Sequence, residues 1–426
     1  MKPPLSASKG TRKSFLLLVV FTAVLAALQV AATPVYAVPV VRILFNGDSV
    51  THGYHGDYSY RLRVADEFNR QGVAFDFVGS RQSPYTTPGT LTSQYLQPFD
   101  SDHFALGGTW LSAQALVIGA EVAKQQPDVV VCQLGLNDLR FEQTPEQVGQ
   151  SLREWVAAVR AARSSTSIIF MNVMPQTNGG RPWLETAIPL FNDLQNVIAS
   201  ELTTTQSPIV VARTADGWDQ AAFTYDGGHA IPTGETVVAQ RIAESFHSLG
   251  ILTQEPRPWR TTEWDRKLVP RISLDAGLAT ISWDTRALTG VKVWMRRSGE
   301  PAQWLVATYK TSPMVLKLPV QRTSYEFRLV AMRRSMVSTL GPGTSVWLRK
   351  APSRVSVVKI SSRGVRWTSS PRATAYVVKW LPSGATVWTS RRTTGLGISL
   401  ANVRKVKVYA INSGGTSLAR WGTRVR

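Results

Sequence analysis

Residues 40–50 read VVRILFNGDSV, an apolar run followed by a short polar turn. The run is typical of a strand buried in a sheet. Gly47 and Asp48 favour a tight turn directly after it, which would lift the hydroxyl of Ser49 clear of the sheet. By itself, Gly-Asp-Ser also fits an ordinary turn or helix cap.

The pattern around this stretch extends from Val38 to about Gly250, where apolar runs alternate with amphipathic stretches of helix length. The runs predict strands at 40–45, 74–78, 129–134, 168–173 and 209–212. The amphipathic stretches predict helices at 58–71, 113–125, 145–163, 184–202 and 234–249. This order implies a parallel sheet covered by helices on both faces, which binds ligands at the carboxyl ends of its strands.

The second half of the chain has a different texture, with short alternating runs rich in Trp, Val, Ile and Tyr between Gly, Pro and Ser turns. A weak internal repeat pairs Ile281–Trp283 with Val365–Trp367, Leu316–Leu318 with Ile398–Leu400, and Val330-Ala331 with Tyr409-Ala410. The offsets of 84, 82 and 79 residues indicate two copies of one unit, each about the size of a seven-stranded β-sandwich.

We therefore predict an α/β domain over residues 38–255, a linker over 256–267, and all-β sandwich modules over 268–350 and 351–426. Each module has a Trp on an inner strand and a Tyr-rich late strand. In this pattern the pair resembles tandem fibronectin type III modules. The resemblance implies a fold and no function.

The N-terminus carries a targeting pattern. Its basic residues are Lys2, Lys9, Arg12 and Lys13. The 18 uncharged residues 15–32 follow, and small or apolar residues precede Ala37. This arrangement predicts a signal peptide over residues 1–37 and a secreted, extracellular protein. Association with the cell wall is expected from the basic C-terminal region. An uncleaved anchor is the alternative, because 18 residues approach the length that spans a bilayer.

Charge is unevenly distributed, with 48 Lys and Arg against 28 Asp and Glu giving +20 in total. Residues 38–255 carry 13 bases and 22 acids, whereas residues 256–426 carry 31 bases and 6 acids. In an exported protein the partner of such a basic region is not expected to be nucleic acid. We expect anionic cell-wall polymers, acidic polysaccharide or lipid head groups, with solvated spacer modules as the alternative.

The composition excludes several classes of protein. With 43% hydrophobic and 18% charged residues among 426, the chain can build two or three cores and is not disordered. Its single cysteine, Cys132, allows neither an internal disulfide nor a cysteine-based zinc site. We expect Cys132 to be a small core residue and not a reactive thiol.

Ser49 can act as a nucleophile only where a base takes its proton and a third group orients that base. His229 stands in the loop Asp226-Gly227-Gly228-His229, just before the last helix predicted in the α/β domain. Asp226 lies three residues upstream, within reach of the imidazole in a tight turn. These residues are the candidate base and its orienting partner.

The other histidines are weaker candidates for this base. His247 falls near the end of a predicted helix, where a solvated charge is the ordinary explanation. His52 and His55 lie too close in sequence to fold back onto Ser49, although either can line the pocket. We expect His103 to be a substrate-side or structural residue.

Acyl transfer also requires hydrogen-bond donors aimed at an oxyanion. After the predicted strand 129–134, Gly135 lets the chain turn and Asn137 offers a side-chain amide. In residues 106–110, LGGTW, a backbone N–H of the two glycines is unshielded by any side chain.

Four blocks in this order resemble those of the SGNH (GDSL-type) hydrolases: Gly47–Ser49, Gly108, Gly135–Asp138 and Asp226–His229. The resemblance covers about residues 40–250. It implies a three-layer, flavodoxin-like α/β fold and a carboxylic ester hydrolase that needs no metal and no other cofactor.

The resemblance also implies the role of each residue. Ser49 would be the nucleophile, His229 the base and Asp226 its orienting partner. The oxyanion would be held by the backbone N–H groups of Ser49 and Gly108 and by the side-chain amide of Asn137. Gly108 is preferred to Gly107 because the family's glycine is usually the later one in this turn.

A finer resemblance rests on residues 75–80, FDFVGS, and on an insertion that ends at Asp102-His103. These features are similar to the acetylxylan-esterase-like branch, which removes acetyl groups from plant-wall polysaccharide. The resemblance suggests His103 and Trp110 as substrate-binding residues. Aromatic residues of the insertion either stack on sugar rings or simply anchor a long loop; they are Tyr85, Tyr95 and Phe99.

The leading hypothesis is a secreted serine esterase that hydrolyses acyl esters, chiefly acetyl esters, of carbohydrate. A lipase or lysophospholipase of the same family is the alternative within the enzyme class. A non-catalytic cell-wall or glycan-binding protein is the alternative outside it. The intact set of candidate residues argues against the last, because a binding module has no need of all five.

Overall fold

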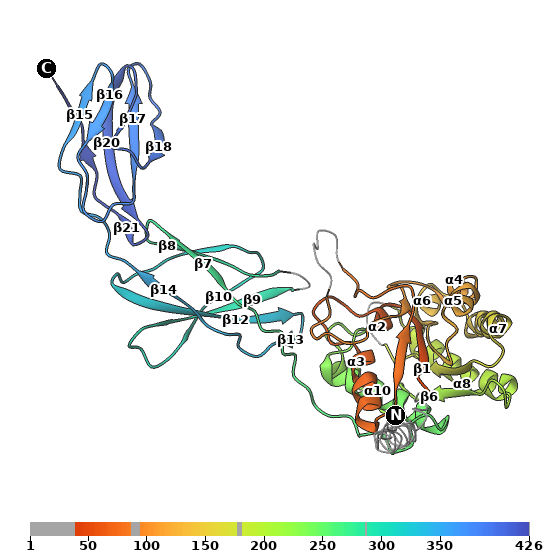
Figure 1. Ribbon diagram of the computed structural model, residues 1–426. Helices are drawn as coiled ribbons and strands as arrows, with labels where there is room; N and C mark the ends of the chain where they lie inside the picture. The colour runs from red at the N-terminus through yellow and green to blue at the C-terminus, as the bar shows by residue number, and fades with distance from the viewer. Residues whose placement is uncertain (1–38, 87–93, 177–180, 286–287, 426) are drawn as a thin grey trace, which may run out of the picture. The chain divides into compact units, whose positions relative to one another are not determined.

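The computed structural model describes residues 39–86, 94–176, 181–285 and 288–425. The predicted signal peptide, residues 1–37, lies outside them. Six parallel strands form one sheet (Figure 1): β1 (Val41–Gly47), β2 (Phe75–Val78), β3 (Phe104–Ala105), β4 (Val129–Gln133), β5 (Ser167–Met171) and β6 (Ile209–Ala212). The strand order is β2-β1-β4-β5-β6, with β3 also paired to β1.

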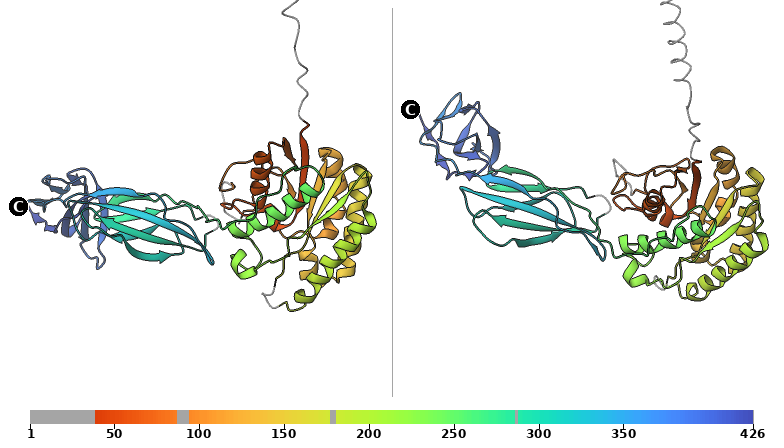
Figure 2. Two further views of the ribbon diagram at one scale, coloured as in Figure 1. Left: turned by 90° about the horizontal axis from the view of Figure 1, so that it is seen from below. Right: turned by 60° about the horizontal axis from the view of Figure 1, so that its bottom comes forward.

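Helices cover both faces of this sheet, as Figures 1 and 2 show. One face packs against α3 (Tyr60–Gln71) and α10 (Pro232–Ser248). The other packs against α4 (Leu111–Ala115), α5 (Ile118–Gln125), α7 (Pro145–Ala162) and α8 (Leu184–Leu202). Three short helices complete the domain: α2 (Ser49–His52), α6 (Leu136–Arg140) and α9 (Gln220–Phe223). The predicted three-layer α/β fold is confirmed.

The connections place β1 where the order of strand addition reverses, with β2 on one side of β1 and β4 on the other. From β1 the chain passes through α3 to β2 on one face, then through α4 and α5 to β4 on the other. A crevice opens at the carboxyl end of a sheet where connections diverge in this way. Ser49 follows β1 at that point.

The prediction of one helix over 113–125 is wrong. The chain forms α4 and α5, and between them Leu116 is 87% exposed. Leu116 and Val117 fit the apolar spacing of a continuous helix, so the hydrophobic period could not reveal the break. The early start of α4 at Leu111 has a clear cause, because the carboxylate of Asp138 accepts the Leu111 N–H at 2.8 Å.

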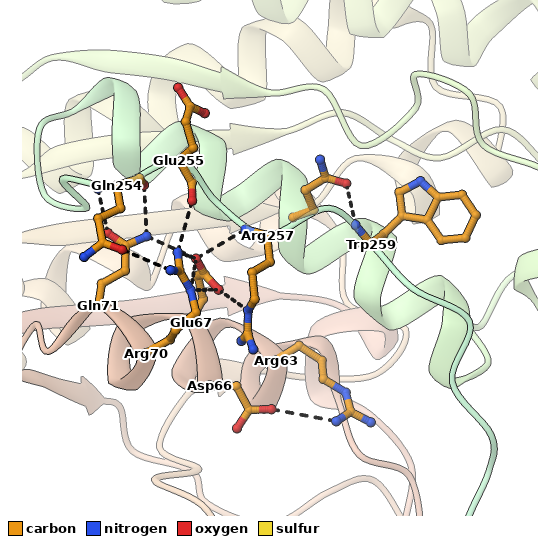
Figure 3. Close-up of polar contacts among 10 residues, drawn as sticks. Arg63, Asp66, Glu67, Arg70, Gln71, Gln254, Glu255, Arg257 and Trp259 are labelled. Carbon is orange, nitrogen blue, oxygen red and sulfur yellow. Dashed lines mark hydrogen bonds and ion pairs between the residues drawn. The ribbon is translucent and has the colours of Figure 1, made fainter.

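The segment after α10 packs back onto α3 (Figure 3). Glu67 accepts hydrogen bonds from Arg70 and, at 2.8 Å, from Arg257 Nε. Gln71 accepts the Gln254 N–H at 2.9 Å. The predicted linker 256–267 forms no helix or strand, but it is attached along its length to the α/β domain.

The first β module contains eight strands: β7 (Arg271–Asp275), β8 (Leu278–Ser282), β9 (Gly290–Arg297), β10 (Trp304–Tyr309), β11 (Met314–Lys317), β12 (Thr323–Arg333), β13 (Met336–Val337) and β14 (Thr344–Leu348). One sheet has the order β11-β8-β7. The other has the order β10-β9-β12-β13, with β14 also paired to β12.

The second β module contains nine strands: β15 (Val358–Ser361), β16 (Gly364–Trp367), β17 (Ala375–Pro382), β18 (Thr389–Thr393), β19 (Gly397–Ile398), β20 (Val403–Asn412), β21 (Gly415–Thr416), β22 (Arg420–Trp421) and β23 (Thr423–Arg424). Its sheets, β19-β16-β15-β23 and β18-β17-β20-β21, follow the same pattern as those of the first module. Ile281 in β8 and Val365 in β16 occupy matching strands, as the sequence repeat predicts. The prediction of two all-β modules is confirmed.

No helix among the described residues is both long enough and apolar enough to cross a membrane. Cys132 lies in β4 with 2% of its surface exposed, and burial raises the pKa of its thiol. It is a core residue, as predicted.

Candidate active site

Ser49 is the first residue of α2 and directly follows Asp48, whose Oδ1 accepts the Val50 N–H at 2.9 Å and so caps the helix. A Cβ on Gly47 would lie 2.2 Å from the hydroxyl oxygen of Thr51, so only glycine fits there. Gln133, at the end of β4, accepts a hydrogen bond from the same Thr51 hydroxyl at 3.0 Å. The turn that presents Ser49 is therefore held by two neighbouring strands.

His229 lies in the loop between α9 and α10, and its two ring nitrogens have different partners. Nε2 is 2.9 Å from Ser49 Oγ, and Nδ1 is 2.8 Å from Asp226 Oδ2. Asp226 Oδ1 accepts the backbone N–H groups of Gly228 and His229 at 3.0 and 2.7 Å. The structure thus joins the three predicted residues in one chain of hydrogen bonds.

These hydrogen bonds decide the charge of Asp226. Burial alone would raise the pKa of its carboxyl, but the ring and backbone N–H groups of His229 and the Gly228 N–H outweigh burial and lower the pKa to about 2. Asp226 is therefore ionised at neutral pH. A carboxylate in this position holds the imidazole in the tautomer whose Nε2 can accept a proton from serine.

The turn that holds Gly108, a predicted oxyanion donor, lies near Ser49. A Cβ on Gly107 would be 3.7 Å from Ser49 Cβ, so this turn lies against the serine. The Gly107 N–H donates to His52 Nδ1 at 3.1 Å, whereas the Gly108 N–H has no acceptor among the described residues. Gly108 has a φ of +79°, which glycine adopts without strain. This difference supports Gly108 as the donor.

Asn137, in α6, places its side-chain amide next to the turn that holds Gly108. Its side-chain Nδ2 donates to the carbonyl of Thr109 at 3.0 Å and lies 3.3 Å from Asp48 Oδ2. The amide therefore sits between the residue after Gly108 and the residue before Ser49. Burial raises the pKa of Asp48 to about 6 against the lowering effect of the Val50 N–H.

Asp138 was not singled out by the sequence, yet it fixes the turn that carries Gly108. Its carboxylate accepts the N–H groups of Leu111 and Ser112 at 2.8 and 3.2 Å, which anchors the start of α4. The Asp138 side chain is fully buried. An acidic residue next to Asn137, three positions after a glycine, is the only signal that the sequence offers for this role.

The prediction of a substrate contact for His103 is wrong. His103 is completely buried, its Nδ1 accepts the Ala105 N–H at 3.0 Å, and burial lowers its pKa to about 2. His52 is also a neutral structural residue, because burial lowers its pKa to about 4. Its bond to Gly107 makes it a support for the oxyanion turn.

Trp110 follows Thr109, whose carbonyl accepts the Asn137 amide. Its ring stacks on Phe141 at 5.3 Å between centroids, and Phe141 is 59% exposed. The aromatic residues of the insertion mainly anchor it: the Tyr95 hydroxyl donates to the His52 carbonyl at 2.7 Å, and Phe99 packs on Tyr95 at 5.2 Å.

Four further residues near the site could not be identified from the sequence. The rings of Tyr54 and Tyr225 flank His229 at 5.1 and 5.9 Å. Asp57 and Glu235 line a cavity of about 20 Å³ that Ser49 and His229 also line. Within the described ranges, no three His, Cys, Asp or Glu side chains gather in a way that could hold a metal ion.

One family match agrees with this geometry. Residues 45–237 match the GDSL-like Lipase/Acylhydrolase family. Among solved structures, the chain is similar to a carbohydrate esterase family 3 from Talaromyces cellulolyticus, at 25% identity and a TM-score of 0.43, over 49% of this chain and 98% of that one. It is also similar to a family 3 carbohydrate esterase from Clostridium thermocellum, at 21% identity and a TM-score of 0.41, over 50% and 97% of the two chains.

No curated protein matches the chain. The family match nevertheless includes all four blocks that meet around Ser49, from the turn after β1 to the loop before α10. The family match thus falls within the α/β domain, over residues 45–237, and the protein is a carboxylic ester hydrolase.

Proposed function

We propose that the protein is a secreted serine esterase that removes acyl groups, and acetyl groups above all, from carbohydrate. The observation that carries the proposal is the 2.9 Å contact between His229 Nε2 and Ser49 Oγ. A serine and an imidazole at this distance can exchange a proton while the oxygen attacks an ester.

In the proposed mechanism, Ser49 Oγ attacks the ester carbonyl carbon while His229 Nε2 takes the hydroxyl proton. The resulting imidazolium is stabilised by the carboxylate of Asp226. When the tetrahedral intermediate collapses, the bond to the alcohol breaks and His229 returns the proton to the leaving oxygen. Water then attacks the acyl-enzyme in the same way, which releases the acid and restores Ser49.

The negative charge on the intermediate needs fixed donors. The backbone N–H of Ser49 stands at the start of α2, where no carbonyl of the helix can accept it. The N–H of Gly108 and the amide of Asn137 complete the proposed set. Donors held in place before the reaction stabilise the oxyanion without any reorganisation.

The surroundings of Ser49 support a short acyl group more than a fatty acyl chain. The cavity that Ser49 and His229 line has a volume of about 20 Å³, which is too small for a fatty acyl chain. The stack of half-buried Trp110 on exposed Phe141 offers an aromatic surface of the kind that packs against sugar rings.

Labelling with a fluorophosphonate tests the nucleophile without knowledge of the substrate. We expect the probe to modify Ser49, located by peptide mapping, and to leave Ser49→Ala unlabelled. Ser49→Ala should lose turnover while its thermal unfolding stays nearly unchanged. Absence of labelling in the wild-type protein would favour the non-catalytic, glycan-binding alternative.

A series of p-nitrophenyl esters from acetate to palmitate separates the two enzymatic alternatives. An acetylxylan-type esterase should have its highest kcat/KM on acetate, with a steep fall as the chain grows. A lipase or lysophospholipase should prefer the longer esters, and that result would contradict our proposal for the substrate.

For the basic C-terminal modules, whose pattern resembles fibronectin type III, we propose retention on an anionic polysaccharide of the cell wall. One face of the second module supports this partner. Lys407 Nζ lies 4.8 Å from the ring centre of Trp388 and 5.5 Å from that of Trp421, and Lys379 lies 6.0 Å from Tyr409. Cations and aromatic rings on one face suit an acidic sugar chain.

A further inference from the structure

The turn between β12 and β13 of the first β module lies against the loop that carries His229. Arg333, the last residue of β12, is only 5% exposed. Its guanidinium forms an ion pair with Asp57 and donates to the His55 carbonyl at 2.8 Å. Both partners belong to the α/β domain, between α2 and α3.

Arg333 also contacts the two rings that flank the imidazole. Its guanidinium carbon lies 5.8 Å from the ring centre of Tyr54 and 5.3 Å from that of Tyr225. Tyr54 meets the His229 ring edge-on at 5.1 Å, and Tyr225 stacks on it at 5.9 Å with 19° between the planes. The imidazole is therefore enclosed by two aromatic rings that share one cation.

The neighbouring residues of the turn reach the same loop. The Ser335 hydroxyl donates to the Tyr225 carbonyl at 3.3 Å, and the Tyr225 N–H donates to the His229 carbonyl at 3.1 Å. Arg334 lies 3.8 Å from Asp226 Oδ2. Three consecutive residues of the β module thus touch the surroundings of His229 and Asp226.

The positive charge of Arg333 offsets buried carboxyl groups near Ser49. Asp57 and Glu235 are both buried in the cavity behind Ser49, where burial raises the pKa of each carboxyl and the positive charge of Arg333 lowers it. An unpaired carboxylate in such a site is costly, and its field would act on the nearby imidazole.

We propose that Arg333 is a positioning residue for His229, and that the first β module therefore forms part of the esterase active site. The inference rests on the proposed roles of Ser49 and His229. It goes beyond the family match, which ends at residue 237 and so includes no residue of the module. The module is then more than a spacer or an anchor.

Point variants of the full-length protein test this role. Arg333→Met removes the charge and its contacts. The double variant Asp57→Asn/Arg333→Met removes both charges together, so that no carboxylate is left unpaired. Tyr54→Leu removes one ring between Arg333 and His229 and leaves the charges in place. Arg328→Met, which removes an arginine paired with Glu326 on the same strand, is the matched control.

We measure kcat and KM on p-nitrophenyl acetate, the rate of fluorophosphonate labelling, and thermal unfolding. A misplaced imidazole should lower kcat and the labelling rate together, by about 10-fold or more, with KM changed less than about twofold. We expect this result for Arg333→Met, for the double variant and for Tyr54→Leu, partial recovery for Arg333→Lys, and no change for Arg328→Met.

Wild-type kcat in the folded double variant, with only a lower unfolding temperature, would overturn the proposal, because Arg333 would then serve stability alone. If the double variant does not fold, wild-type kcat in Tyr54→Leu would overturn it equally. The failure of the proposed function is distinguishable, since the wild-type protein itself would then show neither hydrolysis nor labelling.

Discussion

The side-chain amide of Asn137 has two hydrogens, and one of them is held by the Thr109 carbonyl at 3.0 Å. The other points to the weaker contact with Asp48, at 3.3 Å. An oxyanion on the substrate can compete for this second hydrogen. We expect Asn137→Ala to lose roughly 10²–10³ in kcat, the usual effect of removing one such donor.

The measurement is kcat on p-nitrophenyl acetate together with thermal unfolding, with Asn196→Ala as the control. Asn196 lies on an exposed face of α8 and donates only to the Asn192 carbonyl of its own helix. Wild-type turnover in Asn137→Ala would remove this residue from the oxyanion site.

Glu235 gives the protein a pH-dependent stability. Burial, assisted by Asp57, raises the pKa of Glu235 from 4.5 to about 8. Between these values the unfolded chain releases the proton and the folded protein keeps it, so the free energy of unfolding falls as pH rises from about 5 to 8. Glu235→Gln should therefore stabilise the protein at pH 8 relative to pH 5, on the order of a few kcal/mol.

Urea unfolding at the two pH values checks this expectation, with the more exposed Glu244→Gln as the control. The amide of a glutamine can still accept the Ser59 N–H, which Glu235 Oε1 accepts at 2.9 Å. An equal effect of Glu235→Gln at both pH values would show that Glu235 is ionised in the folded protein.

At this scale the sequence predicts best where the chemistry is local. The order of the blocks identifies Ser49 and His229, because a strand-end serine and a glycine-rich Asp–His loop leave clear patterns. The prediction of a role for His103 from the sequence fails, because its complete burial depends on tertiary packing that a short sequence pattern does not show. Asp226 is predictable for the same reason as His229, since both lie in one turn.

Among the elements, the short helices α2, α4 and α6 carry the site, and carboxylates hold the starts of α2 and α4. Asp138 holds the start of α4, and with it the turn of Gly108, through two N–H groups. In Asp138→Asn one acceptor oxygen becomes an NH₂ group, so one buried N–H loses its partner at a cost of about 1–3 kcal/mol.

We expect Asp138→Asn to lower both the free energy of urea unfolding and kcat, because the Gly108 N–H would no longer be fixed. Asp216→Asn is the control, since Asp216 is half exposed and forms only a 3.9 Å ion pair with Arg213. Loss of stability with unchanged turnover would mean that the Gly108 turn keeps its place without this anchor.

Several elements follow their patterns closely. The helix predicted over 184–202 and the strand predicted over 209–212 have the same limits in the structure. The helix predicted over 113–125 does not, because its break falls at apolar residues. The short helices were not predicted, since four or five residues are too few for a hydrophobic period to show.

For the whole molecule, the excess of basic residues beyond 256 leads to a prediction about retention. We expect full-length protein to bind a resin that carries polygalacturonate and to elute at a defined salt concentration. The double variant Lys379→Gln/Lys407→Gln should elute at lower salt. A matched change of two exposed lysines in the first module, Lys310→Gln/Lys317→Gln, should have a smaller effect.

Equal elution of the two double variants would mean that net charge, and not the aromatic face around Lys407, controls retention. Truncation near residue 256 is a poor alternative to these variants. It would also remove Trp264, whose indole donates to the Gly56 carbonyl at 3.0 Å, and Arg333. Loss of activity would then be mixed with loss of binding.

The contact between the β module and the active site marks the limit of prediction from sequence. Arg333 and Asp57 are 276 residues apart. An arginine in a very basic region carries no sign that it is buried, and a β strand pattern does not show what its terminal turn touches. Only the folded chain reveals that the two halves share a buried ion pair.

The attachment of residues 254–264 to α3 and α10, shown for 254–259 in Figure 3, has a consequence for the resistance of the chain to proteases. A protease needs a stretch of backbone that can leave its surroundings and extend into the cleft of the attacker. Here hydrogen bonds hold the connecting segment to the α/β domain at Gln254, Arg257 and Thr262. The segment therefore cannot easily extend into the active site of a protease. The hydrolase domain and the β modules should therefore stay covalently joined when the protein is treated with a protease.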